Sequence, residues 1–227
     1  MVGGELTVLI DVEGLNEFKR TFEIAPQISA RAARYAINDT AQRKGLKLSR
    51  DAMTAQVAFP RGYLSEVGRG GEKRFRLSYP ATDTRLEAGI LATQSPTPLA
   101  RFSPDRGRFV ARGPARRNKE GKRPPIRVQI QPGREELLKS AFFVSLRSGN
   151  TGLGIRLKRG ETLTNTVGAK IITTGPLAGV ALLYGPSVDQ VFRTVAVDIS
   201  PPLLEALTVE YLRQFERLFR DANFKAT

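Results

Sequence analysis

The C-terminal part of the chain constrains the fold most, because an apolar segment punctuated by glycines leads there into a long amphipathic helix. Residues 171–183 are typical of buried strands, and Gly185-Pro186 predicts a tight turn behind them. Residues 188–195 predict a short helix, and Pro201-Pro202 predicts a break before a helix that ends near residue 222. A turn that leads from a sheet into a docking helix favours a role in assembly. One serine is the only group of this turn that is capable of covalent chemistry.

Ser200 is the predicted N-cap of the last helix, with two prolines in its first turn. The apolar stripe of this helix suits core packing, and it is wide enough for part of it to meet a neighbouring subunit. We therefore take Leu212, Phe215 and Phe219 as interface candidates. The turn supplies structural and interface candidates as well, with Ser187 capping the short helix: Tyr184, Gly185, Pro186 and Ser187.

Residues 27–58 predict the other long helix, which starts after Pro26 and is rich in alanine. Gly45 is a weak point where we expect a kink. The alanines suggest close packing against a sheet. The opposite side is basic and fits either a solvated face or a polyanion site; it carries Arg31, Arg34, Arg43, Lys44, Lys47 and Arg50.

Alternating apolar and polar residues predict most of the strands. Residues 73–79 and 84–93 should form a hairpin or neighbouring strands, and residues 141–146 should return antiparallel as 154–158. Residues 134–138 predict a short helical turn, and the remaining predictions are strands at 5–13, 126–130, 171–173 and 180–183 and a short helix at 15–22. The sequence thus predicts an α+β fold: one domain over residues 1–227, with a curved, mainly antiparallel sheet packed against an N-terminal and a C-terminal helix.

Residues 95–125 form a Pro/Arg-rich segment that we predict to be an extended arm or insertion. Residues 101–127 hold ten basic residues against Asp105 and Glu120, and apolar residues are too few to offset the chain entropy of ordering the arm. An arm onto a neighbouring subunit, a clamp on the DNA backbone and a solvated loop all stay open. The partner candidates are Arg101, Arg106, Arg108, Arg112, Arg116, Arg117, Lys122 and Arg123, of which Arg112, Arg116, Arg117 and Arg123 are the DNA-contact candidates.

Composition excludes several kinds of chemistry. The chain has no histidine and no cysteine, so it can build neither a Ser-His-Asp nor a Cys-His site, nor a zinc site of the usual ligands. The carboxylates follow no spacing typical of acid/base or two-metal catalysis, so we expect no enzyme activity and no cofactor. The net charge of +14 suggests an anionic partner, an acidic protein face or simply a soluble basic surface. The absence of cysteine, of a signal peptide and of an apolar membrane span favours folding in the cytoplasm.

The order of the parts resembles the minor tail protein Z family, the tail completion proteins of long-tailed bacteriophages and prophages. A strand is followed by the Ala/Arg-rich helix with Ala36-Ile37-Asn38, a basic insertion, and a strand with Ala141-Phe142. The most specific match is Gly185-Pro186-Ser187-Val188, after Tyr184 and before the terminal helix. The resemblance covers roughly residues 28–219; the long insertion and the N-terminal strand depart from it.

The resemblance implies a structural virion protein at the head-proximal end of the tail, assembled in the host cytoplasm. Such a protein completes the tail and enables it to join a filled head. It is expected to be a homo-oligomeric ring, with six copies as the expected number. Its expected partners are a tail terminator or tail tube protein, a head-tail connector protein and genomic DNA, and no membrane. The alternative is a nucleic-acid-binding protein that uses the basic arm on the DNA backbone.

Overall fold

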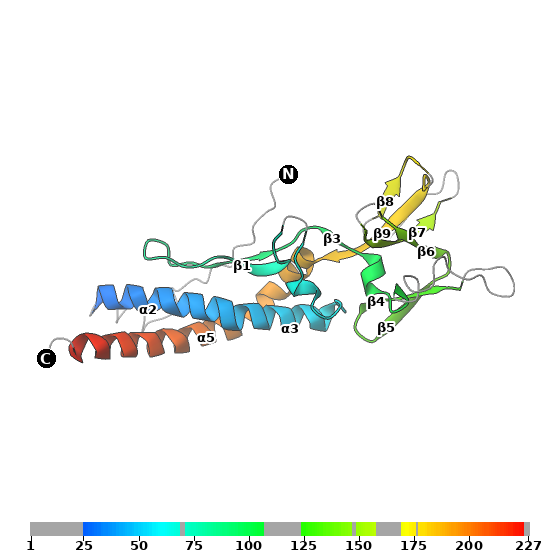
Figure 1. Ribbon diagram of the computed structural model, residues 1–227. Coiled ribbons are helices and arrows are strands. Elements are labelled where there is room, and N and C mark those ends of the chain that lie inside the picture. The colour runs from blue at the N-terminus through cyan, green and yellow to red at the C-terminus, as the bar shows by residue number, and fades with distance from the viewer. Residues whose placement is uncertain are drawn as a thin grey trace. The chain divides into compact units, whose positions relative to one another are not determined.

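The computed structural model describes residues 25–68, 71–106, 124–146, 149–157, 169–175 and 177–224 (Figure 1). Only the backbone is described for residues 223 and 224. The strand predicted at 5–13 and the helix predicted at 15–22 lie outside these ranges.

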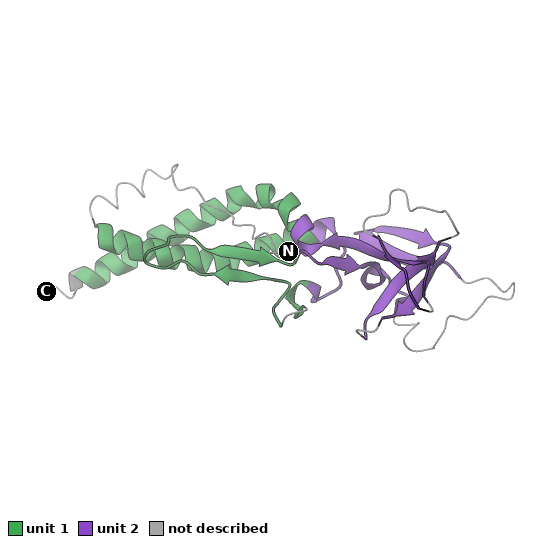
Figure 2. Cartoon of the chain, turned by 90° about the horizontal axis from the view of Figure 1, so that it is seen from above, with its two compact units in different colours: residues 1–53, 64–93, 192–227 green, residues 54–63, 94–191 purple. Residues whose placement is uncertain are grey.

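The fold is α+β, as predicted, and the strands pair antiparallel. In the described ranges the strands form three separate sheets rather than the one sheet expected. The chain divides into two compact units (Figure 2): unit 1 is Met1–Met53, Leu64–Thr93 and Phe192–Thr227, and unit 2 is Thr54–Tyr63 and Gln94–Val191. Whether both units fold together as one domain stays a prediction.

One long helix, which belongs to unit 1 as far as Met53, confirms the helix predicted at 27–58. It consists of α2 (Pro26–Asp39), the π-helical segment η1 (Thr40–Gly45) and α3 (Leu46–Gln56). Thr40 and Leu46, at the two joins, keep right-handed helical angles, so the helical backbone continues through both. Pro26 lies in the first turn, where its missing N–H costs no hydrogen bond.

The π segment keeps one side of this helix buried along its length. The buried positions advance in steps of three or four residues, with one step of five across η1: Ser29, Ala33, Ala36, Thr40, Gly45, Ser49 and Met53. A π-helix bonds i to i+5, so it takes up one extra residue in that turn. Gly45, where a kink was expected, ends this segment, and a Cβ there would lie 3.3 Å from Ile90 Cδ1.

Helix α5 (Val188–Phe224) lies beside α2 in unit 1 (Figure 1). Small residues of α2 let the large side chains of α5 approach closely, which is the efficient way to fill a helix–helix contact. The shared core consists of Ala32, Ala33, Ala36, Ile37, Ala81, Leu207 and Tyr211.

The predicted hairpin of unit 1 is confirmed as β1 (Phe75–Tyr79) paired with β2 (Gly89–Ala92). Phe75 is fully buried edge-on against Phe192 of α5, with 5.2 Å between ring centroids. This aromatic contact attaches the hairpin to the helix.

Unit 2 holds a five-stranded antiparallel sheet. Its strands are β3 (Pro96–Pro98), β6 (Ala141–Ser145), β7 (Thr151–Arg156), β8 (Ala169–Ile172) and β9 (Val180–Ser187), in the order β3-β9-β7-β6 with β8 also on β9. The strand β9 pairs with β7 and β8 through residues 180–183 and with β3 through 184–187. The predicted return of 141–146 as 154–158 is confirmed by the β6–β7 pair.

A second hairpin of unit 2 joins β4 (Ile126–Gln131) to β5 (Arg134–Leu138). The strand at 126–130 is confirmed, but the helical turn predicted at 134–138 is wrong. Gly133 adopts a φ of 77°, so the turn at Pro132-Gly133 directs the following residues back along β4.

The predicted tight turn at Gly185-Pro186 is also wrong, because β9 runs straight through both residues and ends at Ser187. The predicted break at Pro201-Pro202 is absent, since α5 continues through both prolines. A proline removes the N–H that would bond the carbonyl four residues earlier. Those carbonyls belong to Val197 and Asp198, both exposed, where water can satisfy them.

Candidate assembly surface

A row of stacked aromatic rings lies along α5 in unit 1. Tyr211, Phe215 and Phe219 follow one another by one helical turn, with ring centroids 6.1 Å and 5.8 Å apart. The row begins in the core, where Tyr211 is 1% exposed, and ends at Phe219, which is 38% exposed. Phe215 and Leu212 are half-buried against the shared core. The three interface candidates of this helix therefore lie together, and Phe219 is the exposed end of the row.

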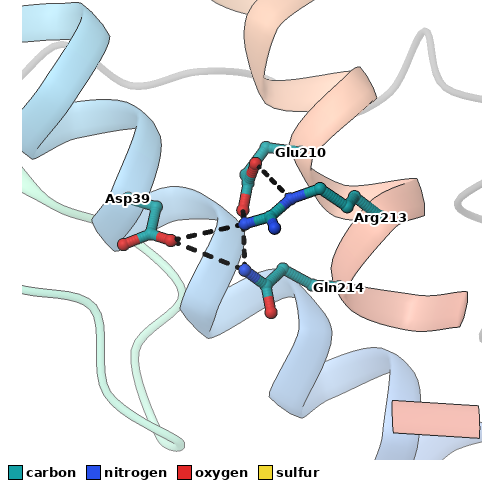
Figure 3. A network of polar contacts seen from close by, with 4 residues as sticks. All are labelled: Asp39, Glu210, Arg213 and Gln214. Atoms are coloured by element: carbon teal, nitrogen blue, oxygen red, sulfur yellow. Dashed lines mark hydrogen bonds and ion pairs between the residues drawn. The ribbon is translucent and has the colours of Figure 1, made fainter. Parts of the chain in front are cut away.

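A polar network beside this row joins α5 to the end of α2 (Figure 3). Arg213 donates to both carboxylate oxygens of Glu210, at 2.6 and 2.9 Å, and its Nη2 lies 3.9 Å from Asp39 Oδ2. The Gln214 amide nitrogen donates to Glu210 at 2.6 Å and to Asp39 at 3.5 Å. Gln214 is 3% exposed, so this network places a polar group within the helix pair and favours one register of α5 on α2.

Charge pairing shifts two pKa values in the network. The hydrogen bond from Arg213 lowers the pKa of Glu210 below its ordinary 4.5, and Gln214 and Arg43 act in the same direction. The hydrogen bond to Glu210 in turn raises the pKa of Arg213. Both groups are therefore charged at neutral pH, and the arrangement suits a structural ion pair rather than proton transfer.

The Tyr184–Ser187 candidates lie in unit 2, within β9, and pair with a segment that the sequence assigned to the arm. Tyr184 lies opposite Pro98, Gly185 opposite Thr97 and Ser187 opposite Pro96. A Cβ on Gly185 would lie 2.7 Å from Cε2 of Phe102. Only glycine admits this ring, so the residue is explained by packing rather than by a turn.

Ser187 caps α5, as the sequence predicted for the helix that follows it. The Gln190 N–H donates to Ser187 Oγ at 3.1 Å, and the Ser187 N–H donates to Gln190 Oε1 at 2.9 Å. This reciprocal pair is a capping box. Ser200, the other predicted cap, instead donates its hydroxyl to the Ala196 carbonyl within the helix.

The first part of the predicted arm is built into unit 2. Besides β3, it forms the 3-10 helix η3 (Leu99–Phe102), whose Leu99, Ala100 and Phe102 are buried. The prediction of an arm from residue 95 is therefore wrong for residues 96–102. The basic, Pro-rich composition of residues 95–125 suggested an unpacked segment, whereas residues 96–102 make buried apolar contacts. Arg101 and Arg106 are half-buried, and Arg101 lies 5.6 Å from the centroid of the Tyr63 ring. The other basic candidates, Arg108, Arg112, Arg116, Arg117, Lys122 and Arg123, lie outside the described residues.

One ion pair near the predicted arm was missed by the sequence reasoning. Arg127 donates through Nη2 to Asp105 Oδ1 at 3.0 Å, and its backbone N–H donates to Oδ2 at 3.2 Å. These contacts raise the pKa of Arg127. They hold together the two ends of the segment between residues 105 and 127. The signal was available, since Asp105 is one of only two acids among ten bases there.

The short motifs behind the family resemblance have structural roles in this chain. The Asn38 amide donates to the Ala81 carbonyl at 3.0 Å and accepts from the Ala81 N–H at 2.7 Å, so it attaches the β1–β2 connection to α2. Ala141 begins β6 and is buried.

Within the described residues, no group of three or more Asp or Glu side chains is placed to hold a metal ion. In the same part of the chain, no helix is long and apolar enough to cross a membrane. Comparison with protein-family models, with curated proteins and with solved structures gives no match to this chain. The likeness to the minor tail protein Z family thus stays a prediction from the sequence.

Proposed function

We propose that this chain is a structural subunit of a phage tail, one that completes the head-proximal end of the tail and enables it to join a filled head. The observation that supports this best is the aromatic row of α5, which passes from the core to the exposed ring of Phe219. Exposed aromatic rings continuous with a core are typical anchors of subunit interfaces. The sequence resemblance supplies the phage context.

In this proposal a second copy of the chain covers the Phe219 end of the row, and repetition of that contact closes a ring, with six copies expected. Ring contacts are heterologous, so the surface that covers Phe219 is a different surface of the neighbouring copy. The ring then meets a tail terminator or tail tube protein on one side and a connector protein on the other.

A complementation experiment tests this function. The gene is deleted from its phage or prophage, and free tails, free heads and joined particles are counted by electron microscopy. We expect full-length tails that do not join heads, and a plasmid copy of the gene should restore joining. Normal joining in the deletion would contradict the proposal.

A matched pair of variants tests the surface within this assay. Phe219→Ser should abolish rescue, because it removes the exposed end of the aromatic row. Leu137→Ser, at an exposed position of β5, should rescue like the wild type. Equal rescue by both variants would remove the aromatic row from the interface.

A further inference from the structure

Three exposed cations lie together at the junction of η1 and α3 in unit 1. Arg43 and Lys44 belong to the π segment, and Lys47 lies in the first turn of α3. None of them makes an ion pair within 4.0 Å in the part of the chain that the structure describes. Arg43 and Lys47 are four residues apart, about one turn and about 6 Å along the axis, so both project from the same side of the helix.

The other cations of this helix are already engaged. Arg34 pairs with Asp83 at 2.8 Å and lies 4.7 Å from the Tyr35 ring centroid. The hydrogen bond of Arg31 to the Tyr35 hydroxyl lowers the pKa of that group. Arg50 lies over the Phe75 ring at 5.9 Å. On this helix the exposed cations without an ion-pair or ring partner among the described residues lie at the junction, which we call the 43–47 surface, defined by Arg43, Lys44 and Lys47. The charge of Arg43 also acts on Glu210.

The surroundings of the 43–47 surface restrict its partner. Residues 26–56 expose no large hydrophobic side chain, whereas cores of protein interfaces and membrane-inserting helices both require them. A polar, cationic surface without apolar groups suits a partner bound through charge alone. Duplex DNA presents one negative charge per about 1.7 Å of its axis and releases counterions when cations replace them.

We propose that the 43–47 surface docks on the phosphodiester backbone of duplex DNA, without regard to base sequence. The π segment supports this reading, because such segments recur at functional sites and this one carries two of the three cations. The net charge of +14 adds long-range attraction that speeds the encounter. The proposal does not rest on the tail function, since a protein of another role could bind DNA by the same surface.

Salt-dependent binding tests the proposal with the full chain and a fluorescein-labelled DNA duplex of arbitrary sequence. The variant Arg43→Gln/Lys44→Gln/Lys47→Gln removes three charges. The control Arg61→Gln/Lys139→Gln/Lys170→Gln removes three exposed charges from unit 2. Loss of three phosphate contacts should make the plot of log affinity against log salt shallower by about 2.7 and weaken binding roughly tenfold or more. The control should keep the wild-type slope.

Equal weakening in both variants would overturn the proposal, because total charge would then explain binding. It also fails if the wild type does not bind the duplex at low salt, or if it binds anionic phospholipid vesicles and not DNA. The exchange Arg43→Lys/Lys44→Arg/Lys47→Arg keeps the charges and should bind like the wild type. Loss of binding in that variant with helical circular dichroism intact would likewise contradict a purely electrostatic contact.

Discussion

Gly185 illustrates at the residue scale how packing explains a position that the sequence suggested was a turn. Phe102 occupies the space where a side chain would lie, and its Cε2 would be 2.7 Å from a methyl group on residue 185. Gly185→Ala should therefore lower the free energy of unfolding by about 1–3 kcal/mol. Urea denaturation measures this, and Phe102→Leu in the same chain should recover part of the loss.

The matched control for this change is Gly68→Ala, where the nearest atom would be 3.5 Å from the new methyl group. That contact is ordinary, so stability should change little. If Gly185→Ala were as stable as the wild type, the close approach of Phe102 to β9 would be wrong.

Ser187 makes the second prediction at this scale. Ser187→Ala removes the oxygen that accepts from the Gln190 N–H at the start of α5, so it should cost about 1 kcal/mol of stability. Ser187→Thr keeps a hydroxyl and should retain most of that stability in the same urea titration. A loss equal for both substitutions would point to packing of the buried residue instead of capping.

At the scale of elements, the π segment η1 accommodates one more residue in its turn than an α-helix would. Deletion of Gln42 should convert η1 to α-helix and leave the buried side in phase, so helical content and melting temperature should stay near those of the wild type. Deletion of Lys47 rotates the following turns by about 100° and should unfold the helix pair. Thermal melts followed by circular dichroism compare the two, and similar losses in both would contradict this account of η1.

The Glu210 network predicts a pH dependence of the helix pair. Since the folded pKa of Glu210 lies below its ordinary 4.5, ionised Glu210 stabilises the fold above that value, and its contribution is lost as pH falls through the folded pKa. Glu210→Gln should be less stable than the wild type at pH 7, by under about 1 kcal/mol because Arg213 is largely exposed. The difference should shrink as the pH falls below 4.5 and close once the pH is below the lowered folded pKa. Glu205→Gln on the same helix is the control and should show no such difference.

Several elements could be predicted from the sequence because their signals are local. Alternation marked the β1–β2 hairpin, β4 and the β6–β7 pair, and alanine content marked α2 and α3. The predictions were wrong where tertiary contacts decide the secondary structure. Residues 134–138 suit either a helix or a strand, and pairing with β4 selects the strand. The Gly-Pro pair in β9 and the Pro pair in α5 are normally breakers, yet strand pairing and solvent exposure accommodate them.

The candidate site was predicted in part for the same reason. The stripe of α5 was visible as a periodicity, and Leu212, Phe215 and Phe219 do lie near one another on this helix. Their role at an interface stays a prediction. The Asp39–Arg213 contact and the Asp105–Arg127 pair join residues far apart in the sequence. Single-sequence patterns do not show which two residues such a pair joins, although the scarcity of acids marked Asp105 as a candidate.

At the scale of the whole molecule, two tasks are proposed for one basic chain. In these proposals the aromatic row on α5 meets the neighbouring copy, and the 43–47 surface meets DNA. Both surfaces belong to unit 1, while the strand with the Tyr184–Ser187 motif belongs to unit 2. A mutation in one surface should leave the other function intact, which is why the two proposals can fail separately.

The proposed role of this chain is that of a structural subunit at the head-proximal end of a phage tail. Cryo-electron microscopy of assembled tails, with the chain located by a fused tag, tests it most directly. We predict a closed ring of identical copies, six in number, at the end of the tail that joins the head. Absence of the chain from assembled tails, or its presence only at another position along them, would contradict the account.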